Sequence, residues 1–145
     1  MDRFYRGLTA GVGAGIPMNL WSNAAYALGF GQLRLLDWAG VIIFGSLPQS
    51  FAQQAYAQVV QLIWVGFLGV VFAFLIPQIS SQGLLGKGVF FSMVSGLLSY
   101  AVPVLFQLPE LTVLDLPTVL NNHIGGLIWG LGLVYILCRL DGEKN

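Results

Sequence analysis

The sequence predicts an all-α integral membrane protein with four membrane-crossing helices. Of its 145 residues, 57% are hydrophobic and only 8% are charged, and the mean hydropathy is +0.80. An ordinary soluble domain carries about 25% charged residues, so a chain this poor in charge could not cover its surface in water. Lipid is therefore the expected solvent for most of its length. The length suits a single helical-bundle domain, residues 1–145.

Four segments are long and apolar enough to cross a bilayer, which takes about 20 mainly apolar residues in a helix. The stretches between them hold nearly all the charges, as the cost of placing charge in lipid requires. Pro77 is expected to end the second helix, and Pro117 suits the first turn of the fourth. The four segments are Gly7 to Phe30, Ser50 to Ile76, Gly88 to Phe106 and Thr118 to Cys138.

The first of these segments shares some features with a secretory signal, because two arginines precede an apolar stretch and an Ala-x-Ala pattern. However, Pro17, Asn19 and Asn23 interrupt the apolar stretch that a signal would need. We therefore interpret the segment as the first membrane helix.

The segment from Leu33 to Ser50 is apolar but too short to span, so we expect an interfacial or re-entrant helix between the first two membrane helices. Asp37 could cap its start, and Gly45 and Pro48 mark its end. The residues leave open whether this helix lies on the membrane or dips into it.

The basic residues predict that both termini are cytoplasmic. With the N-terminus inside, five basic residues lie on the cytoplasmic side and only Arg34 lies outside, which agrees with the positive-inside rule for short loops. The five are Arg3, Arg6, Lys87, Arg139 and Lys144.

Glycines at four-residue spacing mark helix faces that can pack closely, because small residues let backbones approach where lipid provides no hydrophobic drive. The same rows could instead form a contact between copies of the chain, and the pattern does not separate these two readings. The helix-packing candidates are Gly7, Gly11, Gly15, Gly96, Gly126 and Gly130.

Polar side chains recur at one depth in the predicted outer half of the membrane. Asn23, Gln58, Ser99 and His123 come from four different helices, and Ser92, Ser95 and Ser99 share one helix face. These side chains could form ordinary hydrogen bonds between helices, or they could line a functional polar cavity. The candidate cavity residues are Asn19, Asn23, Gln58, Gln61, Ser99, Asn122 and His123.

His123 is the single histidine, and it shares a face with Gly126 and Gly130, so we expect it to point into the bundle. A metal or haem site from His123 with Met18 or Met93 would have few ligands. No catalytic constellation and no phosphate-binding loop appears in the sequence, and the single cysteine, Cys138, excludes an intramolecular disulfide. We expect no enzyme activity, no cofactor and no metal, and the net charge of zero gives no sign of nucleic-acid binding.

Three stretches, RGLTAGVGAGIPMNLWS, LDWAGVIIFG and NHIGGLIWGL, resemble small bacterial membrane proteins of the YqhR-like kind. The resemblance covers most of the chain and implies four helices in a bacterial cytoplasmic membrane. It carries over no catalytic residue.

These observations favour a non-enzymatic, tightly packed bundle in the lipid bilayer that self-associates or serves as a subunit of a membrane complex. The alternative is a small channel or transporter with an outward-facing polar cavity around His123. A third reading, an enzyme or redox subunit using His123, would require a bound metal or chromophore.

Overall fold

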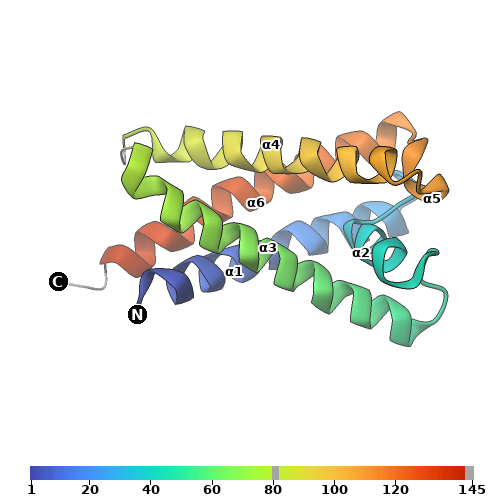
Figure 1. Ribbon diagram of the computed structural model, residues 1–145, viewed down its shortest axis with the longest axis horizontal. Helices are drawn as coiled ribbons and strands as arrows, with labels where there is room; N and C mark the ends of the chain where they lie inside the picture. The colour runs from blue at the N-terminus through green and yellow to red at the C-terminus, as the bar shows by residue number, and fades with distance from the viewer. Residues whose placement is uncertain (80–81, 143–145) are drawn as a thin grey trace.

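The computed structural model describes residues 1–79 and 82–142, and over these residues it is all-helical without strands. This confirms the predicted all-α fold class. Figure 1 shows the arrangement, with the two termini at one end of the bundle and α2 and α5 at the other. The six helices are α1 (Arg3–Ala27), α2 (Leu35–Phe44), α3 (Phe51–Ile79), α4 (Leu84–Leu105), α5 (Pro109–Thr112) and α6 (Leu116–Gly142).

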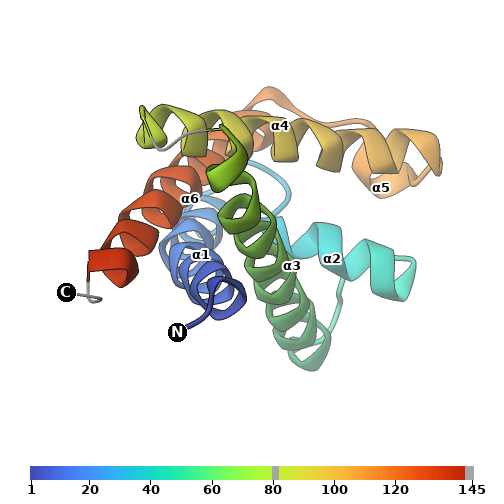
Figure 2. The same cartoon turned by 60° about the vertical axis from the view of Figure 1, so that its left-hand side comes forward.

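The first helix is the centre of the bundle. It packs against α3 on one side and α6 on the other, while α4 packs against α6 and α2 against α3 (Figures 1 and 2). Trp129 joins α6 to α1, because its indole Nε1 donates a 2.9 Å hydrogen bond to the Gly11 carbonyl. The same ring lies 6.3 Å from Phe91 on α4, centroid to centroid.

Three of the described helices are long and apolar enough to cross a membrane: Phe51–Pro77, Leu84–Leu105 and Leu116–Gly142. The 25-residue α1 is not among them, although it is long enough. Its composition explains the difference, since the positions it buries against α3 and α6 are glycine, alanine, Asn19 and Ser22 along with Met18. The helix at the centre meets protein rather than lipid on these faces, so it can be less apolar.

Glycine lets α1 and α3 meet backbone to backbone. A Cβ added at Gly7 would lie only 2.7 Å from the Gly69 carbonyl oxygen and 2.7 Å from the Val70 Cα. The α4–α6 contact is built the same way, because a Cβ at Gly130 would lie 2.8 Å from the Gly88 carbonyl oxygen. Both pairs gain dispersion contact that a larger residue would prevent.

The short helix α2 begins and ends as its sequence predicts. Asp37 Oδ2 accepts from the Arg34 backbone N–H at 2.6 Å, and Gly45 ends the helix with φ of 73°, a left-handed conformation that suits glycine. Trp38 and Val41 pack with Leu111 of α5 in a small second core. This core closes the end of the bundle that lies away from the termini (Figure 1).

One helix boundary differs from the prediction. Pro77 does not end α3, which continues to Ile79 with the proline inside it. Proline removes only one backbone hydrogen bond, and in a hydrocarbon environment a helix that continues keeps the neighbouring backbone groups paired. The expectation for Pro117 is confirmed, since it is the second residue of α6.

The loop between α1 and α2 is held against the start of α6. The Gln32 backbone N–H donates to Thr118 Oγ1 at 2.8 Å, and the Asn121 side chain donates to the Phe30 carbonyl. From α1, Trp21 Nε1 donates to the Asn121 carbonyl at 3.3 Å. These bonds fix the α1–α2 loop against the first turn of α6, at the end of the bundle where α2 begins.

Candidate functional site

Two amide pairs join α1 to α3. Asn19 Nδ2 donates to Gln61 Oε1 at 2.7 Å, and both side chains are buried. One turn further along, Asn23 Nδ2 donates to Gln58 Oε1 at 3.2 Å. Each asparagine also donates to the carbonyl four residues before it, Gly15 and Asn19 respectively. All four residues of the two pairs therefore hold α1 and α3 together.

The polar run at the start of α6 has three separate roles. Asn121 binds the α1–α2 loop, as described above. Asn122 Nδ2 donates to the Tyr100 hydroxyl on α4 at 3.1 Å. His123 Nδ1 lies 2.7 Å from the Val119 carbonyl oxygen on its own helix, and its ring stacks on Tyr100 at 6.0 Å between centroids. The two amides thus join α6 to other parts of the chain, and the imidazole is positioned by the helix that carries it.

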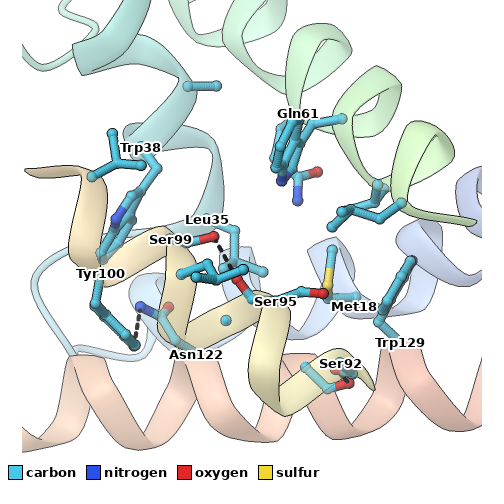
Figure 3. Close-up of a pocket in the computed structure, with 18 of the residues that line it drawn as sticks. Met18, Leu35, Trp38, Gln61, Ser92, Ser95, Ser99, Tyr100, Asn122 and Trp129 are labelled. Carbon is cyan, nitrogen blue, oxygen red and sulfur yellow. Dashed lines mark hydrogen bonds between the residues drawn. The ribbon is translucent and has the colours of Figure 1, made fainter. Parts of the chain in front are cut away.

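A cavity of about 520 Å³ lies between α3 and α4, with walls from five helices. We call it the α3–α4 cavity. Figure 3 shows it with Gln61 above and Ser95 and Ser99 below. Most of its lining is aliphatic, aromatic or methionine, including Trp38, Trp64 and Trp129. The volume falls within the range of small-molecule sites, about 300–1,000 Å³.

The α3–α4 cavity has few polar groups. Among the residues that the structure describes, no Lys, Arg, Asp or Glu lines it. The polar lining residues are Gln61, Ser92, Ser95, Ser99, Tyr100, Asn122 and His123. An apolar site with a small number of polar groups is the usual form of a ligand site.

Gln61 contributes unused hydrogen-bond donors to the α3–α4 cavity. Its side chain is 7% exposed, and its Oε1 accepts from Asn19. Within the described part of the chain its Nε2 makes no hydrogen bond, and the amide points into the cavity (Figure 3). A ligand that accepts from Gln61 Nε2 would give these donors a hydrogen-bond partner.

His123 and the α4 serines contribute acceptors. Since the Val119 carbonyl can only accept, His123 Nδ1 carries the proton in the neutral ring and Nε2 has a free lone pair. Ser95 and Ser99 donate to the carbonyls of Phe91 and Ser95, at 2.8 and 3.0 Å. Their hydroxyl oxygens keep lone pairs that can accept.

The structure divides the predicted cavity residues into two groups. Gln61, Ser99, Asn122 and His123 line the α3–α4 cavity, whereas Asn19, Asn23 and Gln58 are not among its lining residues. The sequence pattern indicated a common depth but not which helix face would meet which neighbour. It did not select Trp38 and Tyr100 for the site, although the spacing of Ser92, Ser95 and Ser99 marked the α4 face that lines it.

The predicted packing glycines also divide. Gly7, Gly11 and Gly15 contact α3, and Gly130 contacts α4. Gly126 lies near Ser92 Oγ, at 3.1 Å from an added Cβ, and also lines the cavity. Gly96 differs, because a Cβ there would meet nothing within 4 Å and the residue faces the α3–α4 cavity. Its face of α4 is free of any helix contact at that point.

The α3–α4 cavity brings together the three candidate metal ligands named from the sequence, because Met18, Met93 and His123 all line it. Within the described residues there is no group of three or more His, Cys, Asp or Glu side chains that could hold a metal ion. A metal site in this cavity would therefore have one imidazole and two thioethers as its protein ligands.

A charged cluster lies beside α2. Arg34 and Asp37 form an ion pair at 3.1 Å, with side chains that are 14% and 4% exposed. Arg34 also donates to Gln54 Oε1 on α3 at 3.2 Å, and its guanidinium lies 4.6 Å from the centroid of the Tyr26 ring on α1. The cluster therefore links three helices, a role that the sequence pattern did not predict for Arg34.

Over the described residues, the fold and the cavity define an all-helical protein with membrane-length apolar helices and a mostly apolar cavity between α3 and α4. Comparison with known proteins adds no relative, since no family model, no curated protein and no solved structure matches the chain. The geometry of the α3–α4 cavity is therefore the basis for assigning a function.

Proposed function

We propose that this chain is a non-catalytic, multi-pass membrane protein that binds a lipid-like amphiphile, a molecule with a hydrocarbon chain and a small polar head, in the α3–α4 cavity. The observation that carries the proposal is the cavity itself, about 520 Å³ in volume, with aliphatic and aromatic walls. Cavities with mostly apolar walls accept apolar ligands. The mostly apolar lining favours a hydrocarbon chain over the water-filled path that a polar channel would need.

Access from the bilayer is expected between α3 and α4. The two helices lie close at the ends that their connection joins and diverge toward α2 and α5 (Figures 1 and 2). Large apolar side chains are exposed on both, including Ile63, Trp64, Leu97 and Leu98. In a membrane these side chains meet lipid, so an amphiphile could enter sideways without crossing water.

We further propose that α1 is a fourth crossing and that both termini lie on the cytoplasmic side of a bacterial inner membrane. Two features support this topology: the basic residues of the termini, Arg3, Arg6 and Arg139, and the place of both termini at one end of the bundle (Figure 1). The Arg34 cluster and α5 would then face the outside.

Self-association and membership of a larger membrane complex remain predictions. The glycines that could have formed a contact between copies already contact α3 or α4 within the chain, with Gly96 as the exception. Gly96 faces the α3–α4 cavity, so its free face is assigned to the ligand.

The test is to fill the cavity without disturbing the fold. In Gly96→Phe the ring has room, because a Cβ there meets nothing within 4 Å, and the change also removes the conformational freedom of glycine in a helix. We expect wild-type protein extracted in mild detergent to retain about one amphiphile per chain for this single cavity. Gly96→Phe should retain none, as measured by extracting and quantifying bound lipid.

Gly86→Phe is the matched control, because Gly86 lies on the same helix, an added Cβ there meets no described residue within 4 Å, and Gly86 does not line the cavity. It should retain as much lipid as the wild type. Equal retention by all three proteins would show that the lipid binds elsewhere and would overturn the proposal.

A further inference from the structure

We infer that the α3–α4 cavity selects an amphiphile with an uncharged, hydroxyl-bearing head over a charged one of the same chain length. This inference rests on the proposed function and specifies its ligand. Three features of the cavity carry it: the missing charges, the free donors of Gln61 and the free acceptors opposite them.

The missing charges exclude ionic heads. In the described part of the chain no Lys, Arg, Asp or Glu lines the cavity, so an ammonium head would find no carboxylate there, and a phosphate head would find a counter-charge only where His123 took up a proton. Gln61 lies ten residues into the candidate span Phe51–Pro77, about 15 Å along the helix, which would place it near the middle of a hydrocarbon core about 30 Å thick that began at Phe51. An unpaired charge at that depth is strongly disfavoured.

Gln61 provides the donor side of the site. Its Nε2 has two hydrogens, makes no hydrogen bond to a described residue and belongs to a residue that is 7% exposed. The Oε1 atom is held by Asn19 at 2.7 Å. This bond fixes the amide orientation, so that the donors and not the acceptor face the ligand (Figure 3).

The α4 wall provides the acceptor side. Ser95 and Ser99 lie across the cavity from Gln61 (Figure 3), and both direct their protons to backbone carbonyls of α4. Their oxygens can accept, as can Nε2 of the neutral His123 ring. A hydroxyl group can form hydrogen bonds with both walls, because its oxygen accepts from Gln61 while its proton is donated to a serine or to His123. An ester carbonyl could satisfy only the Gln61 side.

The experiment uses four probes with one C18 chain and different heads: oleyl alcohol, oleyl sulfate, oleyltrimethylammonium and octadecene. Purified full-length protein in a non-ionic detergent is mixed with equal amounts of all four, and the bound species are counted by native mass spectrometry. The sulfate and ammonium heads are permanently charged, so protonation cannot convert them to neutral forms. We expect oleyl alcohol to exceed each of the others by about tenfold or more, the size of one lost buried hydrogen bond.

Two variants separate the donor role of Gln61 from its structural role. Gln61→Met removes the donors and the bond to Asn19 together, whereas Asn19→Leu removes the bond and leaves the donors. The preference for the alcohol over octadecene should vanish in Gln61→Met, and it should be smaller but still present in Asn19→Leu, where the donors remain although no bond from Asn19 orients them.

The outcomes distinguish the two levels of the proposal. Binding of oleyl sulfate or oleyltrimethylammonium at least equal to that of the alcohol would overturn the inference and leave the proposed function standing. Binding of octadecene equal to the alcohol in the wild type would do the same. Absence of all four probes from the wild-type protein would contradict the proposed function itself.

Discussion

Asn19 and Gln61 show how a single polar contact serves both packing and binding. Both are at least nine-tenths buried, with 6% and 7% exposed, and their amides meet at 2.7 Å. The bond holds α1 to α3, and it also directs the remaining donors of Gln61 into the α3–α4 cavity. The second amide pair, Asn23 with Gln58, is only partly buried and longer, at 3.2 Å.

A double-mutant cycle should find the two amide pairs unequal. Asn19→Leu and Gln61→Met, alone and combined, should give a coupling free energy of about 1–1.7 kcal/mol, the upper part of the range for interhelical hydrogen bonds in membranes. The Asn23–Gln58 cycle should give about 0.6 kcal/mol or less, near the average for such bonds. Unfolding in mixed detergent micelles measures both, and equal or absent coupling would contradict the assigned roles.

Glycine has opposite roles at Gly11 and Gly96. A Cβ at Gly11 would meet the backbone of α3, including the Gly66 Cα at 3.0 Å, whereas one at Gly96 would meet nothing. Gly11→Ala should therefore lower the free energy of unfolding by about 1–3 kcal/mol, as overpacking does. Gly96→Ala should raise it by about 0.5–1 kcal/mol through helix propensity. The contrast fails if the two variants shift the thermal midpoint in the same direction.

At the scale of elements, α2 depends on the buried ion pair between Arg34 and Asp37. Asp37→Ala would leave Arg34, whose side chain is 14% exposed, with Gln54 and the Tyr26 ring as its remaining side-chain partners among the described residues. Removing one partner of a buried pair costs about 3–5 kcal/mol. We expect about 3 kcal/mol, because those two partners compensate in part.

The ion pair between Arg6 and Asp141 is the comparison, because the Arg6 side chain is as buried as that of Arg34, at 15% exposed, whereas the Asp141 side chain is 59% exposed and Asp37 is buried. Asp141→Asn should change the free energy of unfolding by about 0–1 kcal/mol, as exposed pairs do. Denaturation of both variants in the same detergent makes the comparison. A loss for Asp37→Ala no larger than that for Asp141→Asn would show that α2 is held by its apolar contacts instead.

Helix positions were the most predictable elements, and helix contacts the least. Apolar runs and the charges between them located α3, α4 and α6, and Asp37 and Gly45 located the ends of α2. Spacing along one helix also grouped Ser92, Ser95 and Ser99 correctly. It could not pair faces of different helices, because that pairing depends on crossing geometry that no local pattern records. The sequence therefore predicted a place in the cavity wall for both Asn19 and Gln61, whereas the structure has Gln61 and not Asn19 in that wall.

Pro77 and α1 show two further limits of sequence reasoning. A proline rule learned from water-exposed helices predicted an end at Pro77, but α3 continues past it. Hydropathy ranks α1 below the other long helices, because its buried face is made of glycine, alanine and amides. In a membrane bundle the central helix can be the least apolar one, since protein replaces lipid around it.

At the scale of the whole molecule, the proposed topology places α5 outside and the termini inside. In a Cys138→Ser background, single cysteines at Glu110 and Asp2 report the two sides. A membrane-impermeant maleimide added to intact bacterial cells should label Glu110→Cys and not Asp2→Cys, and permeabilised cells should label both. Labelling of Asp2→Cys alone in intact cells would reverse the orientation.

The most direct test of the central claim is the thermal midpoint of unfolding with and without oleyl alcohol. A ligand that binds only the folded cavity adds about 2.7 kcal/mol to stability at 100 times its dissociation constant, so the wild-type midpoint should rise as oleyl alcohol is added. Gly96→Phe, with the α3–α4 cavity filled, should show no rise, and Gly86→Phe should behave as the wild type. An equal rise in Gly96→Phe would mean that the alcohol acts outside this cavity and would contradict the account.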